Sequence, residues 1–146
     1  MWQALAVIAV AVIAAVLWFF RQRAPALARV RETSRFTLID DGKDGGKLAE
    51  ADPEPLISKK GREVTWVIAN DTDKDIRVTM TGFRLEDPSS PPRSPFANDP
   101  GKTIQPGKDR KIKGRIQADA ARGRYWYTID LDPGTPHNTP EIKIMD

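Results

Sequence analysis

An uninterrupted apolar run at the start of the chain constrains the fold most. From Trp2 to Phe20 the only polar side chain is Gln3, and the run holds no charge, glycine or proline. In a helix with a rise of about 1.5 Å per residue, this run covers roughly 28 Å, which matches the hydrocarbon thickness of a bilayer. We therefore predict a single transmembrane helix over residues 1–20, with the rest of the chain held beside the membrane.

Aromatic and basic residues mark both ends of this run. Aromatic rings are enriched where a membrane-spanning segment meets the headgroups, and arginines stop the span. The residues predicted to fix the helix at the two interfaces are Trp2, Trp18, Phe19, Phe20, Arg21 and Arg23. A cleaved signal peptide is the alternative, but no basic residue precedes Arg21 and the apolar run is longer than such peptides use.

The charges beside the span predict its orientation. Five arginines lie between Arg21 and Arg35, whereas the N-terminal side offers only the terminal amine. Positive residues next to a span tend to stay in the cytoplasm. We expect an inner or plasma membrane protein with its N-terminus outside and its C-terminal domain cytoplasmic; the alternative is a periplasmic or extracytoplasmic domain. In either case, the arginines suit anionic lipid headgroups.

Composition excludes several classes of function. The 146 residues carry 23 basic and 20 acidic side chains, for a net charge of +3, and contain no cysteine. Disulfides, thiolate metal sites and cysteine nucleophiles are therefore excluded. A nucleic-acid partner is not expected either, because such proteins carry a denser basic surface.

The chain divides into four predicted segments. The transmembrane helix over residues 1–20 is followed by a basic juxtamembrane neck over 21–35, and then by a first strand with a flexible linker over 36–55. Residues 56–146 show β-type alternation of apolar and polar side chains between turn clusters, as in Val64–Ile68, Ile76–Met80 and Tyr125–Leu131. The expected fold is therefore an all-β sandwich preceded by a single N-terminal transmembrane α-helix.

Two aromatic residues are candidate partner contacts. Residues 86–101 contain five prolines and so predict an irregular loop, with Phe96 as its large apolar side chain. Phe96 either docks on a partner or packs against its own domain. Trp126 lies opposite the face that Tyr125 and Tyr127 share, and is either a second core residue or an exposed contact. The charged residues of 111–115 are expected to be solvated or to protect a sheet edge.

Three stretches resemble the cupredoxin-like sandwich. Residues 60–70 (KGREVTWVIAN) are similar to the family's strand with a Val-Thr-Trp core, residues 123–127 (GRYWY) to a later strand, and residues 142–144 to the last strand. Immunoglobulin-like sandwiches share much of this pattern. The resemblance implies copper ligands near Ile76 or Arg77, near Ile129 and near Thr139, where this chain has no ligand side chain. A blue-copper site needs a thiolate and two imidazoles, and His137 is the only histidine.

These observations favour a protein without catalytic, cofactor or metal residues. We expect a non-catalytic accessory or structural subunit that stabilises a larger integral membrane protein complex through its span and its β-domain. Anionic lipids at the neck would be a second partner. The alternative is a degenerate cupredoxin-type extracytoplasmic protein with a binding, metal-handling or redox assembly role.

Overall fold

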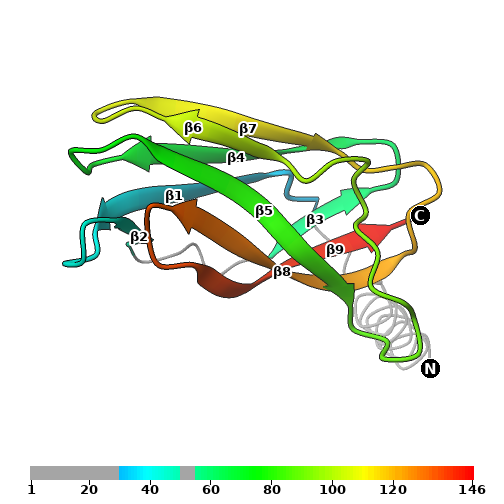
Figure 1. Ribbon diagram of the computed structural model, residues 1–146. Coiled ribbons are helices and arrows are strands. Elements are labelled where there is room, and N and C mark those ends of the chain that lie inside the picture. The colour runs from blue at the N-terminus through cyan, green and yellow to red at the C-terminus, as the bar shows by residue number, and fades with distance from the viewer. Residues whose placement is uncertain (1–29, 50–54) are drawn as a thin grey trace, which may run out of the picture.

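The computed structural model of this protein describes residues 30–49 and 55–146, and over these residues it is a two-layered β-sandwich (Figure 1). The strands are β1 (Thr33–Asp40), β2 (Gly46–Leu48), β3 (Leu56–Lys59), β4 (Glu63–Asn70), β5 (Ile76–Leu85), β6 (Gly101–Ile104), β7 (Asp109–Arg115), β8 (Gly123–Asp132) and β9 (His137–Met145). The predicted all-β sandwich is therefore confirmed for the described part of the chain.

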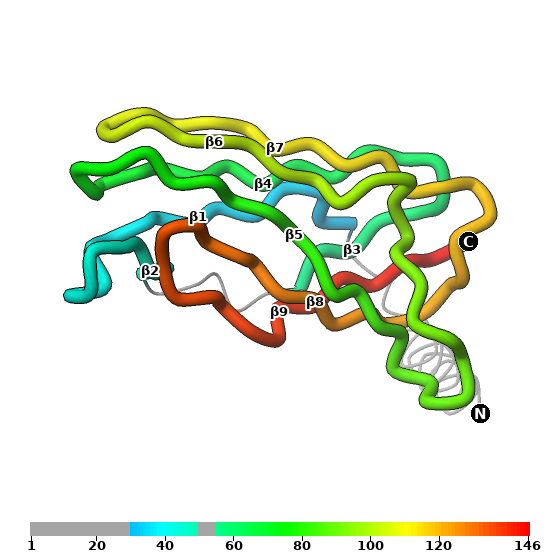
Figure 2. The backbone as a smooth tube through the Cα atoms, in the orientation of Figure 1, coloured from blue at the N-terminus to red at the C-terminus, as the bar shows by residue number. Residues whose placement is uncertain are grey.

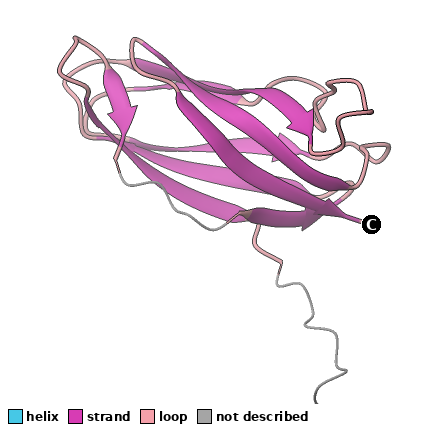
Figure 3. Cartoon of the chain, turned by 90° about the horizontal axis from the view of Figure 1, so that it is seen from below, coloured by secondary structure: helices cyan, strands magenta, loops and turns pink. Residues whose placement is uncertain are grey.

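The strands form one sheet of four and one of five. The first has the order β2-β1-β4-β7, and the second has the order β3-β9-β8-β5-β6. Most neighbours are antiparallel, but β1 runs parallel to β4 and β3 runs parallel to β9. Figure 3 shows the two layers with their strands roughly aligned, as expected for a sandwich. β6 and β7 are edge strands of different sheets, and they lie side by side (Figures 1 and 2).

Alternation of side chains along the strands explains which face of each sheet is buried. In β4, Val64, Trp66 and Ile68 are fully buried, while the residues between them are only partly buried. In β8, the side chains at 125, 127, 129 and 131 point into the core in the same way. Because successive side chains of a strand point to opposite faces, this period of two places the inner faces against each other.

Three aromatic side chains pack together between the two sheets. Trp66 of β4 meets Tyr127 of β8 edge to face, with ring centroids 6.1 Å apart. Phe83 of β5 stacks on Tyr127 at 5.0 Å. The Trp66 indole N–H donates a hydrogen bond to the Tyr127 hydroxyl, 2.9 Å away, so the polar atoms of both rings are satisfied in the core. Burial raises the pKa of Tyr127 to about 12.

Asn70, at the end of β4, organises the neighbouring loops. Its side chain is buried and donates hydrogen bonds to the carbonyl oxygens of Lys74 and Ile104, both at 2.8 Å. Its own oxygen accepts hydrogen bonds from the amide and hydroxyl of Thr72. One buried amide therefore holds the β4–β5 loop in place against the end of β6, because leaving such a group unpaired costs free energy.

The sandwich begins earlier in the chain than residue 56. The first strand starts at Thr33 rather than at Phe36, and it lies inside the four-stranded sheet between β2 and β4. Ser34 and Phe36 are buried there. The sequence predicts a first strand only from Phe36 and does not indicate its pairing, because its partner, β4, lies about thirty residues further on. Residues 33–48 therefore belong to the folded domain and not to a separate linker.

The predicted membrane anchor lies outside the described residues. Residues 1–20 and most of the neck are in that part of the chain, including Trp2, Trp18, Phe19, Phe20, Arg21 and Arg23. Within residues 30–49 and 55–146, no helix has the length and apolar character needed to cross a bilayer.

Ionisation of the core tyrosine should destabilise the sandwich at high pH. An unfolded tyrosine ionises near pH 10 and Tyr127 in the fold near pH 12. The contribution of Tyr127 to the free energy of unfolding is complete below pH 10. It is lost as the pH rises towards 12, because the tyrosine of the unfolded chain releases its proton first. We expect the free energy of unfolding to fall by about 2–3 kcal/mol over this range from Tyr127.

Urea unfolding of residues 30–146, followed by tryptophan fluorescence between pH 8 and 12, measures this effect. The Tyr127→Phe variant is the control, since it keeps the ring and lacks the ionisable group. Its stability should fall less steeply above pH 10, although Tyr125 also has a raised pKa from burial and contributes in both proteins. Equal pH profiles of stability for the unaltered domain and for Tyr127→Phe would contradict a raised pKa of Tyr127.

Candidate functional site

The structure corrects the prediction that Phe96 is a partner contact. Its side chain is only 4% exposed. The ring packs edge to face against Trp66 at 5.9 Å and Phe83 at 5.2 Å, so Phe96 completes the aromatic core. An isolated bridge between Phe96 and Ile116 fixes the backbone of the loop at this point. A proline-rich loop with one apolar residue thus uses that residue to pin itself to its own domain.

Gly114 explains how the ring of Phe96 fits. A Cβ atom at Gly114 would lie 2.8 Å from the Phe96 ring, closer than real contacts allow. The absence of a side chain on β7 at this position therefore makes room for the loop residue. Glycine here serves close packing and not a special backbone angle.

Trp126 lies on the outer face of the five-stranded sheet and is not a core residue. Its side chain is half-buried, and the indole N–H donates a hydrogen bond to Glu141 Oε1 at 3.1 Å. Glu141 also lies 3.6 Å from the guanidinium of Arg124. The indole therefore has a local partner on β9, and the role of Trp126 as a contact for another protein stays a prediction.

The side chains of this chain do not fit a blue-copper centre. The positions that the resemblance assigns to ligands hold Ile76 and Ile129, which are both fully buried apolar residues. His137 begins β9 and is half-buried, and the whole chain has no cysteine. Within the described ranges, no group of three metal-ligating side chains gathers. We therefore derive no chemistry through a copper ion.

A concentration of positive charge lies along the two adjacent sheet edges, β6 and β7. Between residues 102 and 115 the chain has six basic side chains and one carboxylate, Asp109. We call the six together the basic edge: Lys102, Lys108, Arg110, Lys111, Lys113 and Arg115. All six side chains are exposed.

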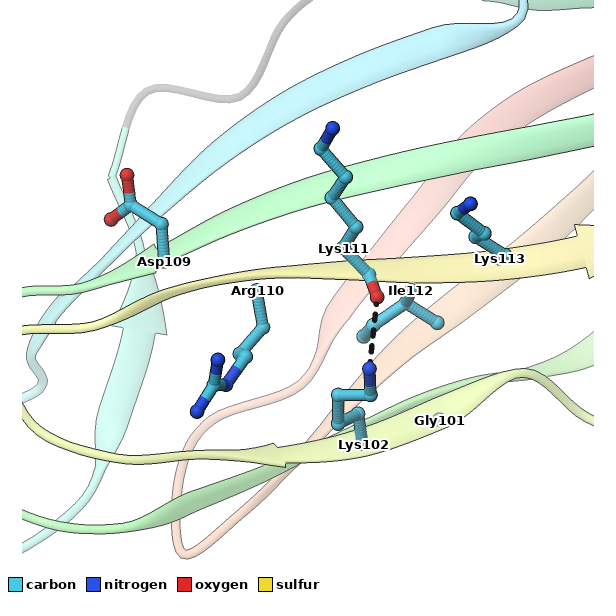
Figure 4. A pocket seen from close by; sticks show the side chains of 7 residues that line it. All are labelled: Gly101, Lys102, Asp109, Arg110, Lys111, Ile112 and Lys113. Carbon is cyan, nitrogen blue, oxygen red and sulfur yellow. Dashed lines mark hydrogen bonds between the residues drawn. The ribbon is translucent and has the colours of Figure 1, made fainter.

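The geometry of two edge strands brings these charges together. Lys102 pairs in register with the inward-facing Val78, so it points from the five-stranded sheet towards β7. Its Nζ donates a hydrogen bond to the backbone oxygen of Lys111, 3.3 Å away. Figure 4 shows Lys102 and Arg110 between the two strands, and Lys111 and Lys113 on the far side of β7. The result is an open groove with positive charge on both walls.

Few of these charges are neutralised within the domain. Lys113 lies 3.7 Å from a carboxylate oxygen of Glu63, and Arg115 donates a hydrogen bond to the backbone oxygen of Gly61. Over the described residues, no carboxylate lies within ion-pair distance of Lys102, Arg110 or Lys111. Elsewhere on the surface, Lys60, Arg62 and others are paired. The edge therefore carries uncompensated positive charge that an acidic partner would neutralise.

The amino-acid sequence indicated half of this surface. Lys111, Lys113 and Arg115 alternate with buried positions, which predicts a charged strand face. The sequence did not indicate that Lys102 joins them, because that requires β6 to lie beside β7 at the open side of the sandwich. The signal that was available is the Pro106-Gly107 turn with basic residues on both of its arms.

A smaller hollow lies under the β5–β6 loop. It is lined by residues of that loop, including Arg93, and by Asp119, Ala121 and Tyr125. The polar groups here bind each other: Tyr125 donates to the Ala121 carbonyl, and Arg93 lies 3.2 Å from Asp119. The hollow therefore offers less free hydrogen-bonding capacity than the basic edge.

Comparison with known proteins adds solved structures of low similarity. No protein-family model matches the sequence, and no curated protein matches it. Reduced auracyanin from Roseiflexus castenholzii is 13% identical and matches 81% of this chain and 100% of its own, with a TM-score of 0.46. A blue copper oxidase from Nitrosomonas europaea is 14% identical and matches 82% of this chain and 46% of its own, at 0.44. Reduced rusticyanin is 14% identical and matches 80% and 82%, at 0.36.

These matches are to proteins of the cupredoxin and copper-oxidase classes. The assignment of the fold as a β-sandwich rests on the strand order and register described above, and not on these TM-scores.

Truncation of Phe96 should destabilise the domain and not merely a contact surface. Phe96→Ala removes a buried ring between two other rings, which typically costs about 3–5 kcal/mol. Urea unfolding of residues 30–146 measures the change. The control is Pro91→Ala in the exposed part of the same loop, which should cost far less. A near-native stability for Phe96→Ala would contradict the core assignment.

The basic edge should dominate the binding of polyanions. We expect Lys102→Gln, Arg110→Gln and Lys111→Gln together to lower the salt concentration that elutes the domain from a heparin column. The matched control replaces three exposed cations on the outer face of the five-stranded sheet, Arg77, Arg84 and Lys143, with Gln. Both variants lose the same net charge, so equal shifts would show that the edge has no special role.

Proposed function

We propose that this chain is a non-catalytic, single-pass membrane protein with a cupredoxin-like domain, and that it is an accessory subunit of a larger membrane protein complex. The uncompensated charge of the basic edge is the observation that carries this proposal. A surface of that kind favours recognition of an acidic partner surface and leaves the domain's own folding unaffected.

The span provides the first half of the proposed contact with the complex. The apolar segment contains alanines at 4, 6, 9, 11, 14 and 15. Small residues allow close approach between helices in lipid, where packing drives association. A subunit held by its helix meets its partner at high effective concentration, so the extramembrane contact need only be modest in strength.

The basic edge provides the second half. β7 is an edge strand, yet Lys102 binds the outward backbone oxygen of Lys111, which hinders the addition of another strand. The partner would therefore be recognised through side-chain charge and not through backbone pairing. The expected partner surface is rich in Asp and Glu and lies just outside the bilayer, on the cytoplasmic side in the proposed orientation.

The lack of cysteine and the single histidine in the sequence favour a structural role over nucleophilic or acid–base catalysis. The whole chain has one histidine and no cysteine. In the described domain, many of the carboxylates lie in turns, where they accept hydrogen bonds from nearby groups. Asp41 is an example: a hydrogen bond from the Lys43 amide lowers the pKa of its carboxyl group. Such carboxylates stabilise turns and are poor general bases.

Native gel electrophoresis of gently solubilised membranes tests the proposal. The tagged full-length chain should resist extraction by alkaline carbonate and migrate at a mass far above its own 16.3 kDa. The triple change Lys102→Gln, Arg110→Gln and Lys111→Gln should shift part of it to low mass, whereas the matched change of Arg77, Arg84 and Lys143 should not. Migration of the unaltered chain at its own mass would overturn the proposal.

A further inference from the structure

The two ends of the sandwich carry opposite charge. One end, which we call the N-terminal end, gathers the start of β1, the β3–β4 turn, the end of β7 and the end of β9. Arg31 bridges to Ile57, the amide of Lys60 binds the carbonyl of Met145, and that of Gly61 binds the carbonyl of Ile116. The β3–β4 turn and the end of β9 lie on the right of Figure 2, and the start of β1 (blue) lies closer to its middle.

Positive charge exceeds negative charge at the N-terminal end. The basic residues there are Arg31, Lys59, Lys60, Arg62, Lys113, Arg115 and Arg122. The carboxylates there are Glu32, Glu63, Asp119 and Asp146. Ion pairs organise this set: Arg62 lies 2.7 Å from Glu32, while Lys60 and Arg122 both lie 2.8 Å from Asp146. After these pairs are counted, the end keeps a net positive charge.

The opposite end of the sandwich is acidic. It consists of the turns 41–45, 71–75, 105–108 and 133–136, on the left of Figure 2. Hydrogen bonds join these turns to each other: Lys74 Nζ donates to the Asp44 carbonyl, and Thr135 donates to Asp41. Its carboxylates are Asp40, Asp41, Asp44, Asp71, Asp73, Asp75 and Asp132, against Lys43, Lys74, Arg77 and Lys108.

The chain reaches its apolar segment from the positive end. Val30, next to the bridge residue Arg31, is 42% exposed and is the first described residue. The chain between Phe20 and Val30 spans at most about 33–36 Å when fully extended. If the apolar segment is in a bilayer, the N-terminal end of the sandwich lies within reach of the headgroups.

We propose that the N-terminal end docks on anionic phospholipid headgroups, so that the sandwich stands on the membrane with its acidic end pointing away. This inference rests on the membrane attachment in the proposed function. Lys59, Lys60 and Arg62, in and beside the β3–β4 turn, are the side chains that meet the headgroup phosphates. Lys60 and Arg62 keep their ion pairs with Asp146 and Glu32, and bind phosphate through the N–H groups that these pairs leave over. The basic edge then extends away from the membrane, open to a neighbouring protein.

The charge pattern favours lipid over an acidic protein at this end. Surface charges are screened beyond about 8 Å at physiological salt, so only the end nearest the bilayer gains from a lipid surface. A negative leaflet attracts basic residues beside a span and repels the acidic turns, and both effects favour the same orientation. An acidic protein would need to enter the space between the domain and the membrane.

A fluorescent label at each end measures the orientation. The chain has no cysteine, so Ala121→Cys at the N-terminal end and Gln105→Cys at the acidic end each give one labelling site. Both positions are exposed and uncharged. The full-length chain is reconstituted into vesicles that carry a headgroup quencher, made either of phosphatidylcholine alone or with a fraction of phosphatidylglycerol.

We expect strong quenching at residue 121 and little at residue 105 in the anionic vesicles. High salt and neutral lipid should both reduce quenching at 121. The changes Lys59→Gln, Lys60→Gln and Arg62→Gln together should lower the docked-to-undocked ratio by about tenfold or more. The matched control replaces Lys43, Lys47 and Arg77, far from this end, and should leave quenching unchanged.

Three results would overturn the inference: quenching that does not depend on lipid charge, equal quenching at both labels, or equal effects of the two triple changes. Near-ultraviolet circular dichroism of each variant shows whether the sandwich is intact, and Lys59→Gln alone is the milder variant if the triple change unfolds it. Carbonate extraction of the same vesicles separates the two proposals. If the chain resists extraction but residue 121 is not quenched, the docking inference alone is wrong. If carbonate extracts the chain, the proposed function is wrong as well.

Discussion

The contact between Trp66 and Tyr127 is the interaction on which the rest of the sandwich depends. It joins the central strand of one sheet to an interior strand of the other, and its hydrogen bond pairs the polar atoms of both rings. Phe83 and Phe96 pack on the same pair of rings. Through Phe96 the core also fixes the long β5–β6 loop, and through Gly114 it sets how closely that loop approaches β7. Removal of this contact would loosen both sheets and the loop together.

Because the core buries Phe96 of the β5–β6 loop, the surface of the domain can recognise partners mainly through its charged side chains. Among the described residues, Val30 is the large apolar side chain that is substantially exposed. The domain therefore offers no broad apolar patch in that part of the chain, and its surface differs from place to place mainly in the sign of its charge. The basic edge, the positive N-terminal end and the acidic turns follow from how the strand ends are distributed. This arrangement is consistent with a domain whose position is set by a membrane and a neighbouring protein.

The strands that alternate clearly in the sequence were predictable, and those that depend on distant partners were not. β4, β5 and β8 show a period of two with large apolar residues, and the structure has them as strands with those residues buried. β1 was only partly predicted, because its parallel partner is β4 and no local turn joins them. Phe96 had two readings in the sequence, because a proline-rich loop looks the same whether its apolar residue points outwards or inwards. The sequence predicted only the β7 part of the basic edge, since Lys102 belongs to a four-residue strand with little alternation of its own.

Three properties can be stated from the order of the amino acids alone: the apolar segment from Trp2 to Phe20, the absence of cysteine with only one histidine, and the β-type alternation after residue 56. Each follows from residue type and spacing alone, because hydrophobic length, ligand chemistry and strand period need no tertiary contact to be stated. Which residues share a surface depends on the tertiary structure. It turned Phe96 inwards, placed Lys102 beside Arg110, and separated the positive and negative turns to opposite ends. These three placements depend on which strand edges meet, because the pairing of segments that are distant in the sequence is set by the packing of the whole core.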